Sequence, residues 1–112
     1  MLHYAITAFA IAALGGFYLA AHVLRGRLAP WAVSLLHAGL GALGLALLIV
    51  LLVQGQATQA VLVGFGLLLV AALGGFVLAS FHLRKRLPPK AVVVVHAGAA
   101  VIGFLTVLSQ VV

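Results

Sequence analysis

Four long runs of apolar residues limit how this chain can fold more than any other feature. They cover about residues 4–24, 31–53, 60–82 and 91–112. Each is close to the length of about 20 residues with which a helix crosses the hydrocarbon core of a bilayer. Only 5% of the 112 residues are charged, whereas soluble domains carry about a quarter. A fold that buries this much apolar surface in water is therefore excluded.

A bilayer allows few backbone structures, because every polar backbone group inside it must be paired within a helix or a closed barrel. The four runs are too long and too continuously apolar for barrel strands, which alternate in polarity over about 10 residues. We therefore expect an all-α integral membrane four-helix bundle with no room for a separate soluble domain. The first run lacks a preceding charged segment and a cleavage site, so we expect it to be retained.

The basic residues are confined to two of the three loops, and no residue is acidic. They are Arg25, Arg27, Arg84, Lys85, Arg86 and Lys90. The middle loop, residues 54–59, is polar but uncharged. Because basic loops stay in the cytoplasm, we expect a bacterial inner-membrane protein with cytoplasmic basic loops and both termini outside. Membrane topology explains this charge pattern, so we expect the lipid bilayer and no nucleic acid as a partner.

The second half of the chain repeats the first half at a constant offset of 59 residues. Leu14-Gly15-Gly16-Phe17 matches Leu73-Gly74-Gly75-Phe76, and His37-Ala38-Gly39 matches His96-Ala97-Gly98. Arginine and proline positions in the two basic loops match at the same offset. Matches of these polar and structural residues do not arise from apolar composition alone, so the repeat is a true feature of the chain.

Each copy of the repeat consists of an inward helix, a basic loop and an outward helix. The two copies therefore have the same orientation, and we expect a pseudo-two-fold axis along the membrane normal. We predict a single transmembrane domain over residues 1–112, built from one helical hairpin at about 1–53 and a second at about 60–112.

The side-chain chemistry of this chain is narrow. Without Asp, Glu or Cys, it forms no carboxylate acid–base pair, no carboxylate proton relay and no thiolate metal site. We therefore expect no independent enzymatic activity. Five histidines remain, and ionisable groups inside a membrane mark functional sites by default.

Four of the histidines are predicted to lie at similar depth near the cytoplasmic side. His37 and His96 each follow the proline that starts their helix by seven residues, about 10 Å into the helix. His22 and His82 lie near the ends of the inward helices. Side chains lean toward the N-terminus of their own helix, which moves these two deeper and the first two shallower.

Glycines accompany the paired histidines at helical spacing. His37, Gly41 and Gly44 share one helix face, and His96 and Gly103 occupy matching positions in the second copy. Small residues leave space beside the backbone. That space accommodates either a closely packed neighbouring helix or a flat macrocycle.

This constellation resembles the small membrane b-type cytochromes, in which histidines from two facing helices of a four-helix bundle bind haem iron. The matching residues are His37 and His96, which approach the pseudo-two-fold axis from opposite sides. Neutral imidazole is a good iron ligand. The resemblance implies one or two haem b groups, electron transport to or from a quinol or partner subunit, and Arg25 and Arg84 nearest to the haem propionates.

The roles of the remaining histidines stay open at this point. His22 and His82 are 60 residues apart rather than 59, so Phe81 occupies the position equivalent to His22. We therefore do not expect them to share a ligand on the axis. A second haem site, a quinone pocket and hydrogen bonds near the lipid headgroups are the alternatives. His3 is expected to be a solvated terminal residue.

Other functional classes fit parts of the pattern. The chain is similar in length and span number to the small multidrug resistance transporters, which depend on a glutamate that this chain lacks. Four imidazoles at one level suit a path for copper, zinc or nickel. A structural subunit of a larger membrane complex and a homodimer also fit, because the helices have apolar faces to spare. An interhelical hydrogen bond is the simplest alternative role for His37 and His96.

Overall fold

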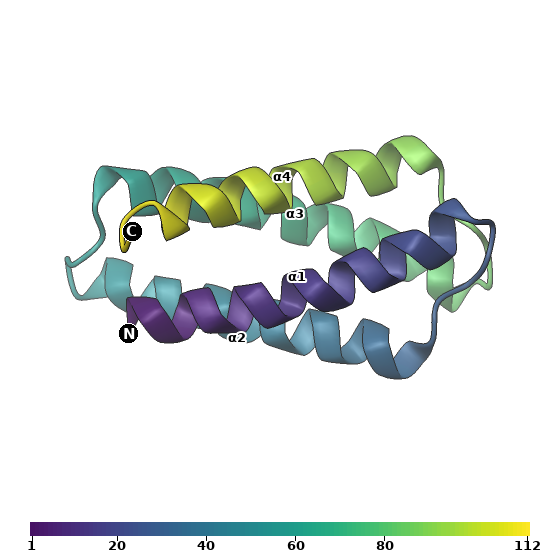
Figure 1. The fold of residues 1–112 in the computed structure, drawn as a ribbon, viewed down its shortest axis with the longest axis horizontal. Helices are drawn as coiled ribbons and strands as arrows, with labels where there is room; N and C mark the ends of the chain where they lie inside the picture. Colours follow the sequence, from purple (N-terminus) through teal and green to yellow (C-terminus); the bar gives the residue numbers. More distant parts are fainter.

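The computed structural model describes residues 1–112 as four helices that run alternately up and down (Figure 1). They are α1 (Leu2–Leu24), α2 (Trp31–Val53), α3 (Gln59–Leu83) and α4 (Lys90–Leu108). All four are long and apolar enough to cross a membrane. The predicted all-α four-helix membrane bundle is confirmed, and the helix limits follow the apolar runs closely.

The ends of the helices follow local sequence signals. The extended backbones of Pro30 and Pro89 immediately precede α2 and α4, because proline cannot occupy a helix interior without breaking a hydrogen bond. α3 begins after Thr58, whose hydroxyl accepts a hydrogen bond from the Val61 N–H at 3.2 Å. α4 ends at Leu108, before the predicted limit at residue 112, in a turn of polar and terminal residues.

Each helix that enters a loop ends with the same capping motif. At the end of α1, Gly26 has φ +79°, and the Arg27 N–H donates to the His22 carbonyl at 2.9 Å. This is the Schellman pattern, which needs a left-handed residue after the helix. At the end of α3 the equivalent left-handed residue is Lys85, with φ +55°. The two basic loops therefore share one backbone shape although only one of them has glycine.

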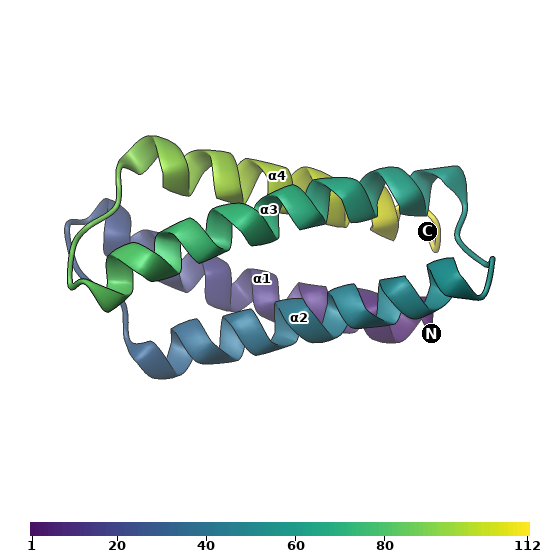
Figure 2. The same cartoon turned by 180° about the vertical axis from the view of Figure 1, so that it is seen from behind.

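The two hairpins pack around a common axis. α1 contacts α2 and α4, and α3 contacts the same two helices, so α1 lies diagonally opposite α3 and α2 lies diagonally opposite α4. Both termini and the α2–α3 loop lie at one end of the bundle, and both basic loops lie at the other (Figures 1 and 2). The longest dimension is 42 Å, enough to span a hydrocarbon core of about 30 Å.

The half of the bundle that carries the termini is tightly packed. Its core consists of Ala5, Phe9, Leu48, Leu51, Val61, Leu68 and Val107. The ring of Phe9 fills the space over Gly44, where an added methyl group would lie 2.6 Å from the ring. In the second copy, Leu68 occupies the place over Gly103. In lipid, where helices gain little from hydrophobic burial, such close packing of small residues holds helices together.

Gly44 tests the role of this packing. We expect Gly44→Ala to destabilise the bundle by about 1–3 kcal/mol, because the added methyl group overlaps the Phe9 ring. Gly41→Ala on the same helix is the matched control, since nothing lies within 4 Å of a methyl group there. Unfolding in mixed micelles measures both. Equal stability of the two variants would contradict the packing account.

The shared loop shape generates a second prediction. Lys85→Gly should stabilise the protein by about 1 kcal/mol, because a left-handed residue with a Cβ carries a steric cost. The reciprocal change, Gly26→Lys, should destabilise it by a similar amount. The same unfolding measurement applies, and a loss of stability in Lys85→Gly would show that this loop does not take the described conformation.

Candidate functional site: a cavity with two paired histidines

The half of the bundle that carries the basic loops is hollow. A cavity of about 940 Å³ lies between the two hairpins and extends from the bundle centre to the basic loops. Its volume is in the range of ligand sites, about 300–1,000 Å³. Most of its lining is apolar, with few polar side chains among the hydrophobic ones. The bundle therefore divides into a packed half and a half with room for a ligand.

Small residues on α1 and α3 create this space. Those that line the cavity are Ala12, Ala13, Gly16 and Ala20 of α1, with Ala71, Ala72, Gly75 and Ala79 of α3 at the equivalent positions. Each helix thus presents a strip of alanine and glycine to the interior. The strips match residue for residue, so the cavity has the pseudo-two-fold symmetry of the repeat.

His37 of α2 and His96 of α4 both line this cavity. The Nδ1 of His37 lies 2.7 Å from the carbonyl oxygen of Ala12, and the Nδ1 of His96 lies 2.7 Å from that of Ala71. A carbonyl oxygen only accepts, so each Nδ1 must carry the proton and donate it. In the neutral ring this leaves Nε2 unprotonated, with a lone pair available to a metal ion.

Two glycine pairs, Gly15-Gly16 of α1 and Gly74-Gly75 of α3, lie against these rings. A methyl group added to Gly16 would lie 3.0 Å from Cε1 of His37, and one added to Gly75 would lie 3.3 Å from Cε1 of His96. The preceding glycine of each pair lies beside the histidine Cβ. Each imidazole is therefore held between a carbonyl and a glycine of the neighbouring helix, in one fixed orientation.

The two rings face the same space from diagonally opposite helices. Their centroids are 6.1 Å apart and their planes meet at 78°. Neither Nε2 makes a hydrogen bond within the protein, and no buried side-chain nitrogen or oxygen lacks a partner. Neither Nε2 atom is therefore enclosed by the protein, and both rings line the cavity. The structure brings the two predicted ligands together in matched geometry.

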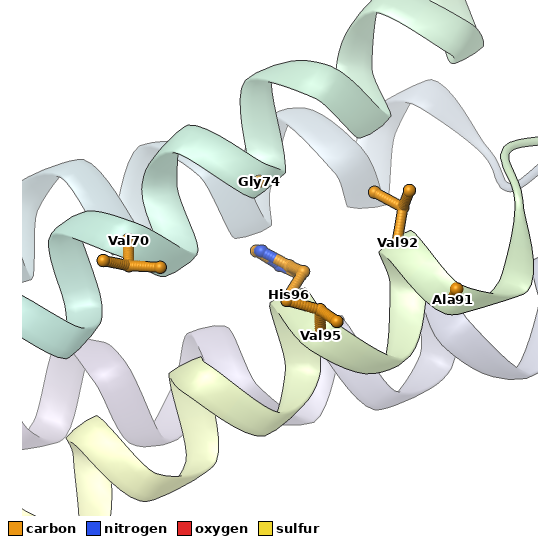
Figure 3. A pocket seen from close by; sticks show the side chains of 6 residues that line it. All are labelled: Val70, Gly74, Ala91, Val92, Val95 and His96. Atoms are coloured by element: carbon orange, nitrogen blue, oxygen red, sulfur yellow. The ribbon is translucent and has the colours of Figure 1, made fainter.

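A smaller hollow reaches His96 from the side of the α3–α4 hairpin. Its volume is about 240 Å³, and its lining residues are Val70, Gly74, Ala91, Val92, Val95 and His96. Figure 3 shows the imidazole extending from α4 toward Gly74 of α3. Apart from His96, the lining is apolar, as expected of a helix surface that faces lipid.

His82 also lines the cavity, at its basic-loop end. Its ring stacks on the Trp31 ring with centroids 3.8 Å apart and planes at 5°. Its Nδ1 lies 3.3 Å from the Ser34 hydroxyl oxygen. Trp31 is itself exposed, and this stack joins the start of α2 to the end of α3.

His22 does not line the cavity. Its Nδ1 donates to the Tyr18 carbonyl of its own helix at 3.0 Å, and its ring lies 4.5 Å from the Tyr18 ring. His3 is exposed at the opposite end of the bundle. The structure therefore separates His22 from His82, in agreement with their unequal places in the repeat. It gathers no group of three or more metal-ligating side chains.

The basic residues differ in their access to the cavity. Arg86 lines it, whereas Arg25 and Arg84 do not. Arg84 instead lies over the Phe81 ring at 4.7 Å and donates to the Ser80 carbonyl at 3.2 Å. Neither arginine that the resemblance implies to be nearest to the propionates lines the cavity. The Schellman turn alone does not account for this difference, because the first loop has the same turn and its Arg27 does not line the cavity.

Sequence reasoning missed three contributors to this site. It paired the glycines with histidines of the same helix, whereas Gly16 and Gly75 contact histidines of the next helix. The sequence does contain a signal for these contacts, because Gly16 and His37, like Gly75 and His96, lie at similar distances from the basic loop that joins their helices. It also missed Ser34 as the partner of His82, because the pair joins the two hairpins and no local pattern links residues so far apart.

Comparison with protein-family models, characterised proteins and solved structures finds no match for this chain.

The tautomers of the paired histidines provide a direct test of the site geometry. We expect ¹⁵N NMR of the histidine-labelled neutral protein to show protonated Nδ1 and unprotonated Nε2 at His37 and His96, because each Nδ1 donates to a carbonyl. Gly16→Val should disturb the His37 signals and leave those of His96 in place. Protonated Nε2 at both rings would contradict the arrangement.

Proposed function

We propose that the cavity binds one haem b between His37 and His96, and that the protein carries electrons. The observation that supports this most is the pair of symmetry-related histidines that present unprotonated Nε2 atoms to one apolar cavity. Iron in haem is commonly held by histidine. A four-helix bundle is also a frequent scaffold for such centres, with ligands on facing helices.

The separation of the two rings supports a shared metal ion. Two imidazoles on opposite sides of one metal ion, each with a metal–nitrogen distance of about 2 Å, have ring centres roughly 6 Å apart. The rings of His37 and His96 are 6.1 Å apart. The alanine and glycine strips of α1 and α3 supply room for a macrocycle on either side of the diagonal that joins the two histidines.

The hydrogen bonds of the two rings also suit ligation. Metal-bound histidines usually donate their other ring proton to a carbonyl or carboxylate, which fixes the ring and increases the basicity of the ligating nitrogen. Here the Ala12 and Ala71 carbonyls accept those protons. The same hydrogen bonds would influence the reduction potential of a bound iron, because hydrogen bonding to the ligands is one of the factors that set this potential.

The distribution of histidines favours a single haem near the basic loops. The opposite half of the bundle has a filled core, and His3 is the only histidine there. By the positive-inside rule, the haem would lie toward the cytoplasmic side, with both termini outside. A quinol or a partner subunit would exchange electrons with it, together with an acceptor on the cytoplasmic side. This arrangement does not by itself carry electrons across the whole bilayer.

The alternatives receive less support. A transition-metal path through four imidazoles conflicts with the absence of any group of three ligating side chains. Two histidines alone remain able to hold a metal ion, so metal analysis must accompany the haem assay. For a purely structural subunit, the interhelical hydrogen bonds of His37 and His96 would suffice, and replacement of these histidines would leave cofactor content unchanged.

The proposal predicts a red protein after purification from haem-replete cells, with sharp alpha and beta bands on reduction and one haem per chain. His37→Ala and His96→Ala should each lower haem affinity by on the order of a hundredfold or more, since even loss of a ligand's hydrogen-bond partner costs 10–100-fold. His22→Ala is the matched control, because His22 does not line the cavity.

Three results would contradict the proposal. The first is a colourless protein with blank haem and iron assays. The second is haem binding that survives replacement of both His37 and His96. The third is copper or zinc at one ion per chain without haem, which would instead favour metal binding or transport.

A further inference from the structure

The basic-loop end of the cavity breaks the symmetry of the repeat. Along most of the cavity wall, residues 59 positions apart are identical or similar, but Trp31, Ser34 and His82 have Lys90, Val93 and Val23 as their counterparts. The three exceptions are not scattered. They contact one another through the Trp31–His82 stack and the hydrogen bond between Ser34 and His82.

This cluster lies on one side of the cavity only. It joins α2 to α3. The equivalent place between α4 and α1 contains the apolar Val23 and Val93, which line the cavity, and Lys90, which does not. Arg86 lines the cavity, whereas its counterpart in the first copy, Arg27, does not. The cavity thus has a polar wall and an apolar wall at the same level.

The polar wall is rich in hydrogen-bond donors. The Trp31 indole and the Arg86 guanidinium are donors only, and the Ser34 hydroxyl can also donate. If that hydroxyl donates to Nδ1 of His82, then Nε2 of His82 carries the proton and donates as well. A wall that combines a fixed positive charge with neutral donors matches an anionic acceptor.

The chain provides no such acceptor itself. It contains no Asp or Glu, so Arg86 has no carboxylate side chain with which to pair. A guanidinium matches the planar geometry of a carboxylate, with two parallel hydrogen bonds. Because the rest of the cavity is apolar, the carboxylate must belong to a largely apolar molecule.

We propose that Trp31, Ser34, His82 and Arg86 form a carboxylate-binding site at the basic-loop end of the cavity. Two sources supply this chemistry. One is a propionate of the haem held by His37 and His96, and to that extent the inference rests on the proposed function. The other is the carboxylate of a separate amphiphile, such as a fatty acid that enters from the membrane.

Trp31 is the only tryptophan of the chain, so its fluorescence reports on this site directly. The purified haem-free protein is titrated with haem b and with haem dimethyl ester, whose propionates are uncharged. A second titration uses oleate and methyl oleate. Each is performed on the unmodified chain, on Arg86→Gln, on His82→Val and on Arg27→Gln, the matched control outside the cavity. Helical circular dichroism and size-exclusion profiles confirm that each variant is folded.

If the site holds a propionate, Arg86→Gln weakens haem b binding by about tenfold, the size expected for a charged hydrogen bond, and leaves the dimethyl ester unaffected. If it holds a separate amphiphile, oleate quenches Trp31 while methyl oleate does not, and Arg86→Gln weakens oleate by a similar factor. His82→Val weakens the charged ligand in either case, and Arg27→Gln changes neither.

The inference is overturned if charged and esterified ligands bind alike in both series, or if Arg86→Gln and Arg27→Gln have equal effects. The two proposals can fail separately. If the protein binds oleate but no haem, the carboxylate site is supported and the haem proposal is contradicted. If Arg86→Gln changes the binding of haem b and of its dimethyl ester equally, the haem proposal is supported and the carboxylate site is contradicted.

Discussion

One hydrogen bond, made once in each hairpin, organises the interior of this protein. The histidine of the second helix in each hairpin donates from Nδ1 to an alanine carbonyl of the first helix. In lipid, an imidazole needs a partner for its N–H, and the carbonyl provides one. The carbonyl oxygen then accepts this hydrogen bond in addition to the one within its own helix. The bond joins the two helices of a hairpin and fixes which ring nitrogen faces the centre. The glycine beside each ring allows the helices to approach closely enough to make it.

The repeat turns this local arrangement into a site between hairpins. Parallel copies place equivalent residues on opposite sides of one axis, so the His37 and His96 rings meet although the backbones of α2 and α4 do not come close to each other. Phe9 over Gly44 and Leu68 over Gly103 each close the packing within one hairpin, and the shared core that includes Leu48, Val61 and Val107 joins the two hairpins at this end. The other half of the bundle can therefore stay open. Tight packing at one end thus stabilises the bundle, and small residues at the other end leave room for the cavity.

Much of this could be predicted from the sequence, for identifiable reasons. The four helices follow from apolar runs that only a bilayer accepts, and their limits follow from the prolines at 30 and 89 and from the polar loops. The pairing of His37 with His96 follows from the repeat. What could not be predicted depends on contacts between different helices. These are the contact of His37 with Gly16 and the stack of Trp31 on His82. Nor could the sequence show that Arg86 lines the cavity whereas Arg84 does not. The 60-residue spacing of His22 and His82 did indicate that they face different ways, because one residue turns a helix by about 100°.

The most direct test of a shared haem is the electron paramagnetic resonance spectrum of the oxidised protein. If both rings held one haem iron with their planes at 78°, a low-spin ferric centre would give a strongly anisotropic signal. We predict that signal at one spin per chain. A rhombic low-spin signal would contradict the crossed arrangement of the rings, and a high-spin signal or none would contradict ligation by both histidines.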